Sequence, residues 1–274
     1  MLHRISLILL CISGLLTSAE ATEWTLVWAD EFEVDGRPNA ANWNYEQGFV
    51  RNNELQWYQP ENAFCENGYL VIEGRRERQP NPEYNPDSKK LKHRREFIDY
   101  TAASLRTKGL HDWLYGRFEV RAKIVAEDGL WPAIWFLGLD KPWPSNGEID
   151  LMEYYDHSIL ANACWESGRR GVPTWDTHKI PVSELGGDDW DEDFHVWRMD
   201  WDATSIRLYV DDRLLNTIEL EKVKNQGGRG PENPFNHPQY LLLNLAIGGD
   251  QGGDPSATTF PSRYLIDYVR VYQK

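Results

Sequence analysis

The sequence predicts an all-β fold, a jelly-roll-type sandwich of two antiparallel sheets. Several short segments alternate inward and outward residues with the two-residue period of half-buried strands. No window with a helical period extends beyond two turns with capping residues at its ends. Turn residues separate the strand-like segments, and no Pro-, Ser- or Gly-rich linker divides the chain. We therefore expect antiparallel connections within a single domain.

The start of the chain predicts an export signal. Met1–Arg4 is a short positively charged start, Ile5–Leu16 is mostly apolar, and Ala19-Glu20-Ala21 has the small-x-small form of a signal-peptidase site. A lipoprotein signal ending at Cys11 is the alternative, but no small residue precedes that cysteine and the apolar run before it is short. We expect residues 1–21 to be removed, and we expect the mature protein to be secreted or periplasmic.

The remaining residues, 22–274, are predicted to form one domain of short strands. The clearest alternating segments are Arg117–Ile124, Val196–Trp201, Ile206–Val210 and Tyr264–Tyr272. The turn signals between strands are Asp35-Gly36, Glu66-Asn67-Gly68, Asp128-Gly129, Asp211-Asp212 and Gly248-Gly249. The stretch Gln79–Arg95, which contains three prolines and a basic run, breaks this rhythm. An exposed loop with solvated charges is expected there, with a binding patch as the alternative.

The composition excludes several classes of protein. With 274 residues, of which 26% are charged and 41% hydrophobic, the chain is long and apolar enough to bury a core. No apolar run of about 20 residues follows the N-terminal segment, so no membrane span is expected. The net charge of −14 argues against nucleic acid or an anionic membrane as a partner. The 13 Trp and 13 Tyr, against 9 Phe, favour a half-polar ligand such as a sugar.

Two cysteines remain after removal of the signal, Cys65 and Cys164. They could pair in an oxidising compartment or stay as two buried free thiols, and both alternatives are open at this point. No spacing of Cys and His residues is typical of a zinc site.

Three acids lie inside an apolar, strand-like run, Glu148, Asp150 and Glu153. Side chains alternate along a strand, so the first two share a face and Glu153 joins them only if one extra residue is inserted. A β-bulge at Leu151-Met152 would provide that residue. Two carboxyl groups about 5–5.5 Å apart are what a retaining glycosidase requires. The alternative is a surface strand that carries solvated acids on one face.

The segment Glu148-x-Asp150-x-x-Glu153 resembles the signature of glycoside hydrolase family 16, in the bulged form of laminarinases. Five further blocks are similar to family blocks in the same order, and together they cover nearly all of the mature chain. They are Trp28–Phe32, Asn53–Tyr58, Tyr115–Arg121, Gly129–Trp135 and Ile266–Tyr272. The resemblance implies a β-sandwich with a concave substrate cleft.

The resemblance also implies roles for individual residues. Glu148 is expected to be the nucleophile, Glu153 the general acid/base, and Asp150 the residue hydrogen-bonded beside the nucleophile. Trp131 and Trp135 match tryptophans that face the cleft, with core packing as the alternative for each. Asn53 and Trp143 are further candidates for substrate binding.

The resemblance implies one metal site, remote from the chemistry. Its ligands would be the Asp267 carboxylate and the backbone carbonyls of Glu31 and Gly68, an all-oxygen set suited to calcium. We expect a structural calcium ion and no catalytic cofactor. The alternative is that Asp267 is an ordinary outward-facing acid.

Specificity is where the sequence departs from the laminarinase pattern. Ser104 occupies the position at which many laminarinases carry an arginine that reaches the sugar, so Ser104 is a further candidate for substrate binding and a roomier site is expected. The leading hypothesis is a secreted, monomeric endo-hydrolase of β-glucan, with 1,3- or mixed linkage. An endo-β-galactosidase acting on galactan, keratan or mucin-type chains is the first alternative, and a transglycosylase is a related one. A non-catalytic carbohydrate-binding sandwich is the alternative from another class.

Overall fold

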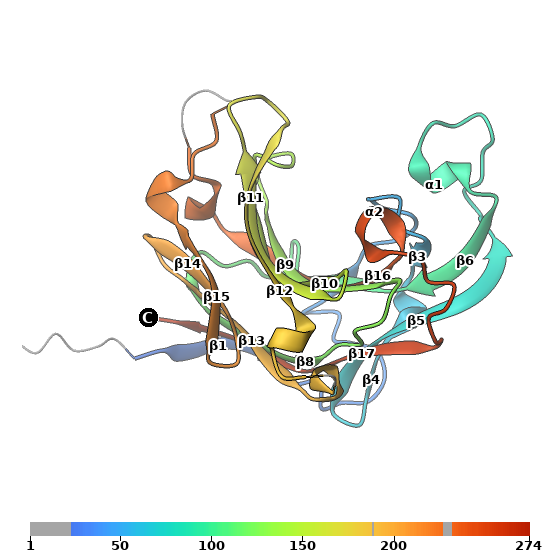
Figure 1. Cartoon of the computed structure of the whole chain (residues 1–274), viewed down its shortest axis with the longest axis horizontal. Helices are drawn as coiled ribbons and strands as arrows, with labels where there is room; N and C mark the ends of the chain where they lie inside the picture. The colour runs from blue at the N-terminus through green and yellow to red at the C-terminus, as the bar shows by residue number, and fades with distance from the viewer. Residues whose placement is uncertain (1–22, 188, 227–231) are drawn as a thin grey trace, which may run out of the picture.

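Two β-sheets lie face to face in the computed structural model, which describes residues 23–187, 189–226 and 232–274 (Figure 1). This arrangement confirms the predicted all-β sandwich. The predicted signal segment, residues 1–21, lies outside the described residues. Within the described part of the chain, no helix has the length and apolar character needed to cross a membrane.

The larger sheet has ten strands and forms the convex layer of the molecule. Its order is β15 (Arg213–Glu219), β14 (Ser205–Val210), β13 (His195–Trp201), β8 (Gly116–Lys123), β17 (Ser262–Gln273), β5 (Tyr69–Pro80), β6 (Phe97–Ala102) and β3 (Gln56–Tyr58). In addition, β1 (Thr25–Asp30) pairs with β17, and β4 (Ala63–Glu66) pairs with β5. The strands pair antiparallel except for β3 and β6, which are parallel, so the expectation of antiparallel pairing holds with one exception.

The smaller sheet has seven strands, all antiparallel, and carries the functional face. Its order is β12 (Pro173–Pro181), β11 (Ser158–Glu166), β10 (Glu148–Tyr155), β9 (Leu130–Gly138), β16 (Gln239–Ile247), β7 (Ser104–Arg106) and β2 (Asn44–Tyr45). Two single-turn helices, α1 (Leu91–Arg94) and α2 (Gly249–Gly252), lie outside the sheets. Five 3-10 turns complete the described elements, at Pro60–Asn62, Val182–Glu184, Trp190–Glu192, Leu220–Lys222 and Pro234–Asn236.

The core fills the space between the sheets because each sheet turns alternate side chains inward. In β8 buried and half-buried residues alternate over all eight positions. Phe118 of β8 meets Phe136 of β9 edge to face, with ring centroids 5.1 Å apart. Trp197 and Trp201 of β13 are fully buried in the same cluster. The alternating segments read from the sequence correspond to β8, β13, β14 and β17, with ends shifted by at most two residues.

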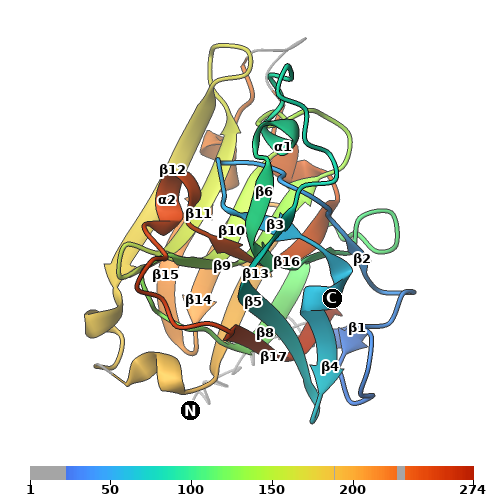
Figure 2. The ribbon, with the colours of Figure 1, turned by 90° about the vertical axis from the view of Figure 1, so that its right-hand side faces the viewer.

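Two projections rise on opposite sides of the smaller sheet. The hairpin of β11 and β12 stands on one side, and the stretch between β5 and β6, which contains α1, stands on the other (Figures 1 and 2). The segment Gln79–Arg95, predicted as an exposed loop, supplies most of that second stretch, although its first two residues are the end of β5. It forms a loop with a single helical turn, in which most residues are exposed or half-buried. The smaller sheet therefore forms a floor, and the two projections form walls on either side of it.

Candidate active site

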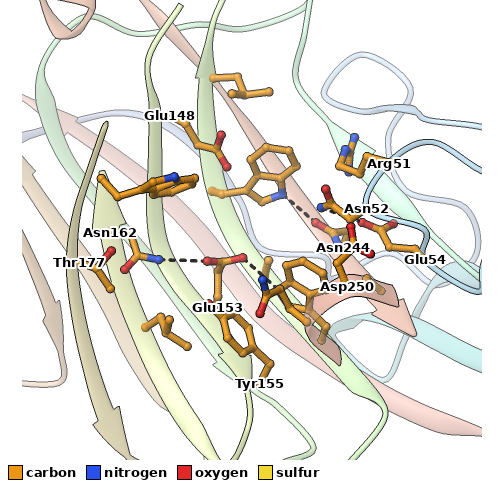
Figure 3. Close-up of a pocket in the computed structure, with 18 of the residues that line it drawn as sticks. Arg51, Asn52, Glu54, Glu148, Glu153, Tyr155, Asn162, Thr177, Asn244 and Asp250 are labelled. Atoms are coloured by element: carbon orange, nitrogen blue, oxygen red, sulfur yellow. Dashed lines mark hydrogen bonds between the residues drawn. The ribbon is translucent and has the colours of Figure 1, made fainter. Parts of the chain in front are cut away.

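A cleft of about 740 Å³ lies on the outer face of the smaller sheet. The inward side chains of β9, such as Ile134 and Phe136, belong to the core, whereas Trp131, Ala133 and Trp135 point the other way into the cleft. Strands β10, β11, β12 and β16 complete the floor and one side, and residues 51–54 with α2 border the other side (Figure 3). The side chains of this cleft come from segments that are far apart in the sequence.

Strand β10 contains the predicted bulge. Asp150 pairs with Asn162 of β11 and Glu153 pairs with Leu160, so three steps on β10 face two steps on its neighbour. The pairing with β9 shifts at the same place. The extra residue returns Glu153 to the face of Glu148, and both carboxylates line the cleft, as predicted.

Glu153 lies in a buried, hydrogen-bonded position at the centre of the cleft floor. Its carboxylate accepts hydrogen bonds from Trp131 Nε1 at 2.9 Å and from Asn162 Nδ2 at 3.1 Å (Figure 3). Burial, followed by the negative charge of Glu148, raises the pKa of Glu153 to about 7, and the two hydrogen bonds oppose this rise in part. Such a carboxyl group holds a proton near neutral pH and is suited to act as a general acid.

Glu148 has surroundings that favour its charged form more strongly. Burial raises its pKa, but hydrogen bonds from Trp143 and Asp150 and the positive charge of Arg51 lower it. Asp150 is fully buried, and burial together with the charges of Glu153 and Glu148 raises its pKa well above the ordinary value. The raised pKa favours the protonated form of Asp150, and in that form Asp150 donates a hydrogen bond that stabilises the Glu148 carboxylate.

Three tryptophans named from the sequence line the cleft. Trp131 and Trp135 are 8% and 7% exposed, and neither belongs to the main core. The Trp135 indole donates to Asn244 Oδ1 at 2.7 Å, so both buried indoles have hydrogen-bond partners on the cleft face. Trp143 is 47% exposed and donates to Glu148. Indole faces of this kind can contact the apolar face of a sugar ring.

Two other predicted substrate contacts are placed differently. Ser104 is fully buried and does not line the cleft, because its hydroxyl points to Glu46 and donates to that carboxylate at 2.8 Å. The expectation that Ser104 meets the sugar directly is therefore wrong. Asn53 is exposed beside the cleft, and its side chain donates at 2.9 Å to Asp250, which does line it.

Sequence reasoning missed several residues that line the cleft, among them Asn162 and Arg51. Asn162 donates to both Glu153 and Asp150, and Arg51 faces Glu148 across the cleft (Figure 3). A polar residue in the otherwise apolar run of β11 was a signal for Asn162. Nothing in the local sequence distinguishes Arg51 from a surface arginine, because its position depends on the fold.

The three positions proposed for calcium converge beside β17. The pairing of β17 with β5 ends at Ile266 and its pairing with β1 begins at Val269, so Asp267 lies between them. Glu31 directly follows β1 and Gly68 directly precedes β5, which places both backbones at this gap. In the structure the Asp267 carboxylate is paired with Arg121 at 2.5 Å. The oxygen donors suit a hard cation, which would compete with Arg121 for the carboxylate.

Cys65 and Cys164 are both buried and both free, so the alternative of unpaired thiols is correct. Cys164 lies on β11 directly opposite Glu148.

Comparison with known proteins identifies the family. Residues 55–270 match the model of glycosyl hydrolases family 16. The chain belongs to this family. A curated beta-glucanase of Rhodothermus marinus is 34% identical over 93% of this chain and 87% of its own length. Two further curated relatives are longer, and the chain spans 34% and 38% of them. This family 16 chain is a glycosidase.

Two solved structures illustrate the range of family 16 enzymes that this chain resembles. One is described as an endo-acting O-glycanase with which members of the human gut microbiota initiate mucin breakdown. It is 35% identical, has a TM-score of 0.83, and covers 92% of both chains. The laminarinase of Rhodothermus marinus is also 35% identical, with a TM-score of 0.73 over 92% of this chain and 98% of its own. At equal identity, the fold agrees more closely with the first.

Proposed function

We propose that this family 16 protein is an endo-acting, retaining hydrolase of β-linked polysaccharide. The observation that carries the proposal is the pair Glu148 and Glu153, which the bulge of β10 places on one face in contrasting surroundings. At Glu148 two hydrogen bonds and the charge of Arg51 oppose the rise in pKa that burial causes, whereas the pKa of Glu153 reaches about 7, so Glu153 retains a proton near neutral pH. A retaining glycosidase needs this division of roles.

The reaction proceeds in two displacements. In the first, a Glu148 oxygen attacks the anomeric carbon while Glu153 gives its proton to the departing glycosidic oxygen, and a covalent glycosyl ester forms. In the second, Glu153 takes a proton from water, the water oxygen attacks the anomeric carbon, and Glu148 leaves as a carboxylate. Two inversions restore the original anomeric configuration. Capture of the ester by a sugar hydroxyl instead of water would give transglycosylation.

The shape of the site supports cleavage within a chain. The lining extends over five strands, from Trp175 on β12 to Ala246 on β16, and includes the loop and helix beyond. A cleft of this extent between two walls accommodates several sugar units. The aromatic side chains along it supply stacking surfaces.

We propose β-glucan, 1,3- or mixed-linkage, as the substrate class, supported by the curated beta-glucanase relative. A galactose-containing chain of the keratan or mucin type is the second candidate. It is favoured by the higher TM-score to the mucin-degrading O-glycanase at the same sequence identity.

A polysaccharide panel tests the proposed function. The protein is incubated with laminarin, mixed-linkage glucan, galactan, keratan and mucin O-glycans, and the products are separated by chromatography. A ladder of oligosaccharides from one polymer, with the β-anomer formed first by NMR, is expected. Binding to a polymer without any product would favour the non-catalytic sandwich, and the initial appearance of the α-anomer would contradict a retaining mechanism.

We propose, in addition, that export removes residues 1–21 and that the mature protein acts as a monomer outside the cytoplasm. Support comes from the form of the N-terminal segment and from the size of a polymeric substrate. Mass spectrometry of the exported protein is expected to find a chain that begins at residue 22. Light scattering is expected to give the mass of one chain.

We also propose a structural calcium ion held by Asp267 and the carbonyls of Glu31 and Gly68. An ion that binds only the folded state raises the melting temperature. Excess chelator is therefore expected to lower the melting temperature of metal-loaded protein by several degrees, without changing kcat at moderate temperature. Asp267→Ala should abolish the effect of the chelator. An unchanged melting temperature in the wild-type protein would leave Asp267 as the ion-pair partner of Arg121.

A further inference from the structure

Arg51 is the only basic side chain among the described residues that line the cleft. Four acids line the same cleft, namely Glu54, Glu148, Glu153 and Asp250. Neighbouring negative charges disfavour the ionised form of Glu148, and a nearby cation opposes this effect. The position of Arg51, facing Glu148 from the opposite border of the cleft, therefore requires an explanation (Figure 3).

The side chain of Arg51 is fixed from below. Its Nη2 group is ion-paired with Glu46, a carboxylate whose side chain is only 10% exposed. Ser104 donates to the same Glu46 carboxylate at 2.8 Å, and the Arg51 guanidinium stacks over the Trp135 ring at 4.9 Å from its centroid. An arginine held by an ion pair and an aromatic face loses little conformational entropy when it binds a ligand.

The loop that carries Arg51 is fixed to both neighbouring elements. Asn52 and Asn53 have φ values of 50°, a left-handed conformation that asparagine tolerates better than most residues and that turns the chain sharply after Arg51. The carbonyl of Asn52 accepts from Asp250 N at 2.8 Å, and the carbonyl of Asn53 accepts from Arg95 Nη2 at 2.7 Å. Hydrogen bonds from Asp250 and Arg95 thus hold the loop that carries the guanidinium.

Two of the three guanidinium nitrogens of Arg51 remain free for a ligand. Only Nη2 makes a hydrogen bond to the described residues, so Nε and Nη1 are unused. They are not among the buried polar atoms that lack a partner, and they therefore remain accessible from the cleft. Nε and Nη1 lie on different edges of the planar guanidinium, so each can donate to a separate hydroxyl group of a bound sugar chain.

We propose that Arg51 is a specificity-determining residue that donates hydrogen bonds to hydroxyl groups of the sugar chain bound beside Trp135, and that its charge also positions Glu148 for attack as a carboxylate. The inference rests on the proposed function, because it concerns how the same cleft selects its substrate. Ser104 and Glu46 act through Arg51, since neither lines the cleft.

The ionisable groups around Arg51 and Glu148 are mostly acidic. The ionisable groups that act on Arg51 include Glu46, Glu54 and Tyr58. Those that interact with Glu148 are Asp150, Glu153, Cys164, Tyr240 and Arg51 itself. Only Arg51 is a cation among them. Its removal is therefore expected to raise the pKa of Glu148, and with it the pH at which activity begins.

The test compares Arg51→Met and Arg51→Lys with Arg106→Met. Arg106 is the matched control because its Nη1 lies 3.8 Å from the same Glu46 carboxylate, whereas the residue does not line the cleft. On the best polymer of the panel, Arg51→Met is expected to raise KM about tenfold or more and to move the acid limb of kcat/KM to higher pH. Arg51→Lys should raise KM but keep the acid limb, because it keeps the charge and loses the planar fork.

Melting curves will establish that each variant folds. Kinetic constants and a pH profile for Arg51→Met equal to those of Arg106→Met would overturn the proposal. If the wild-type protein cleaves no polymer, the proposed function fails, and calorimetry of Glu148→Gln with glucan and galactose-containing tetrasaccharides then decides the role of Arg51. Addition of Arg51→Met to that variant should weaken binding about tenfold or more. Binding that Arg51→Met leaves unchanged, or no binding of either tetrasaccharide by Glu148→Gln itself, would overturn the proposal.

Discussion

Glu148 and Glu153 are identical side chains on one strand, and burial raises the pKa of both, but their neighbours differ in charge. Trp143, Asp150 and Arg51 stabilise the charge of Glu148. Burial and the negative charge of Glu148 keep the proton on Glu153. The assignment of nucleophile and acid follows from these contacts, because sequence spacing alone treats the two residues alike.

Substitution of each glutamate is expected to have a different outcome. Glu148→Gln should lower kcat about a thousandfold or more, since no covalent ester can form. Glu153→Ala should still form the ester from a substrate with an activated leaving group, and azide should then restore turnover by attacking that ester. Measured rates with and without azide distinguish the two. Rescue of Glu148→Gln to give a product of retained configuration would reverse the assignment.

The pH dependence of activity is set by Glu153. Because this group must be protonated at the start of the reaction, kcat/KM should fall as the pH rises through about 7. The hydrogen bond from Asn162 stabilises the ionised form and lowers the pKa, so Asn162→Ala should move this falling limb to higher pH.

Asn216→Ala is the control for this measurement, because Asn216 donates to the backbone of β11 at Ala161 without lining the cleft. Its pH profile should match that of the wild-type protein. A falling limb that stays in place in Asn162→Ala would show that another group controls it.

At the scale of elements, strands β9 and β10 each turn one face to the core and the other to the cleft. The inward residues of β9 fill the core, and Trp131 and Trp135 on its outer face line the cleft. The bulge in β10 adds Glu153 to that outer face. The resemblance to family 16 predicted that these two tryptophans face the cleft, and the spacing of the acids predicted the bulge.

Loss of a cleft tryptophan should reduce activity more than stability. Trp131→Ala and Trp135→Ala are expected to lower kcat/KM about a hundredfold, because the sugar is no longer held in the reactive geometry. Trp197→Ala, in the main core, provides the comparison and should cost about 3–5 kcal/mol of the free energy of unfolding. Denaturant titration and kinetics measure both effects. A cleft variant as destabilised as Trp197→Ala would indicate that this tryptophan supports the fold instead.

At the scale of the whole molecule, the sequence predicted the layers and the catalytic strand but not the complete cleft. The alternating segments, the turns and the acid cluster are local patterns, and each has a local physical cause. Arg51, Asn162 and Asp250 reach the cleft from separate elements, so their roles depend on strand order, which a single sequence does not reveal. The prediction for Ser104 failed for the same reason, since its hydroxyl faces Glu46 inside the fold.

The order of the strands explains how these residues meet. Strand β16, near the C-terminus, lies between β9 and β7 and brings Asn244 beside Trp135. The loop at residues 51–54 then closes over the end of β16, where Leu55 N donates to Ile247 O at 2.8 Å. The cleft is therefore a product of long-range pairing and should form only when the whole sandwich has folded.

Trapping of the covalent intermediate tests the central claim most directly. The probe is a 2-deoxy-2-fluoro glycoside with an activated leaving group, built on the sugar that the polysaccharide panel identifies. The fluorine slows both formation and breakdown of the ester, and the activated leaving group speeds only its formation, so the ester accumulates. Intact-mass spectrometry should detect one added glycosyl group per chain, and peptide mapping should locate it on Glu148. A label on Glu153 or any other residue, or inactivation without a covalent adduct, would contradict the account.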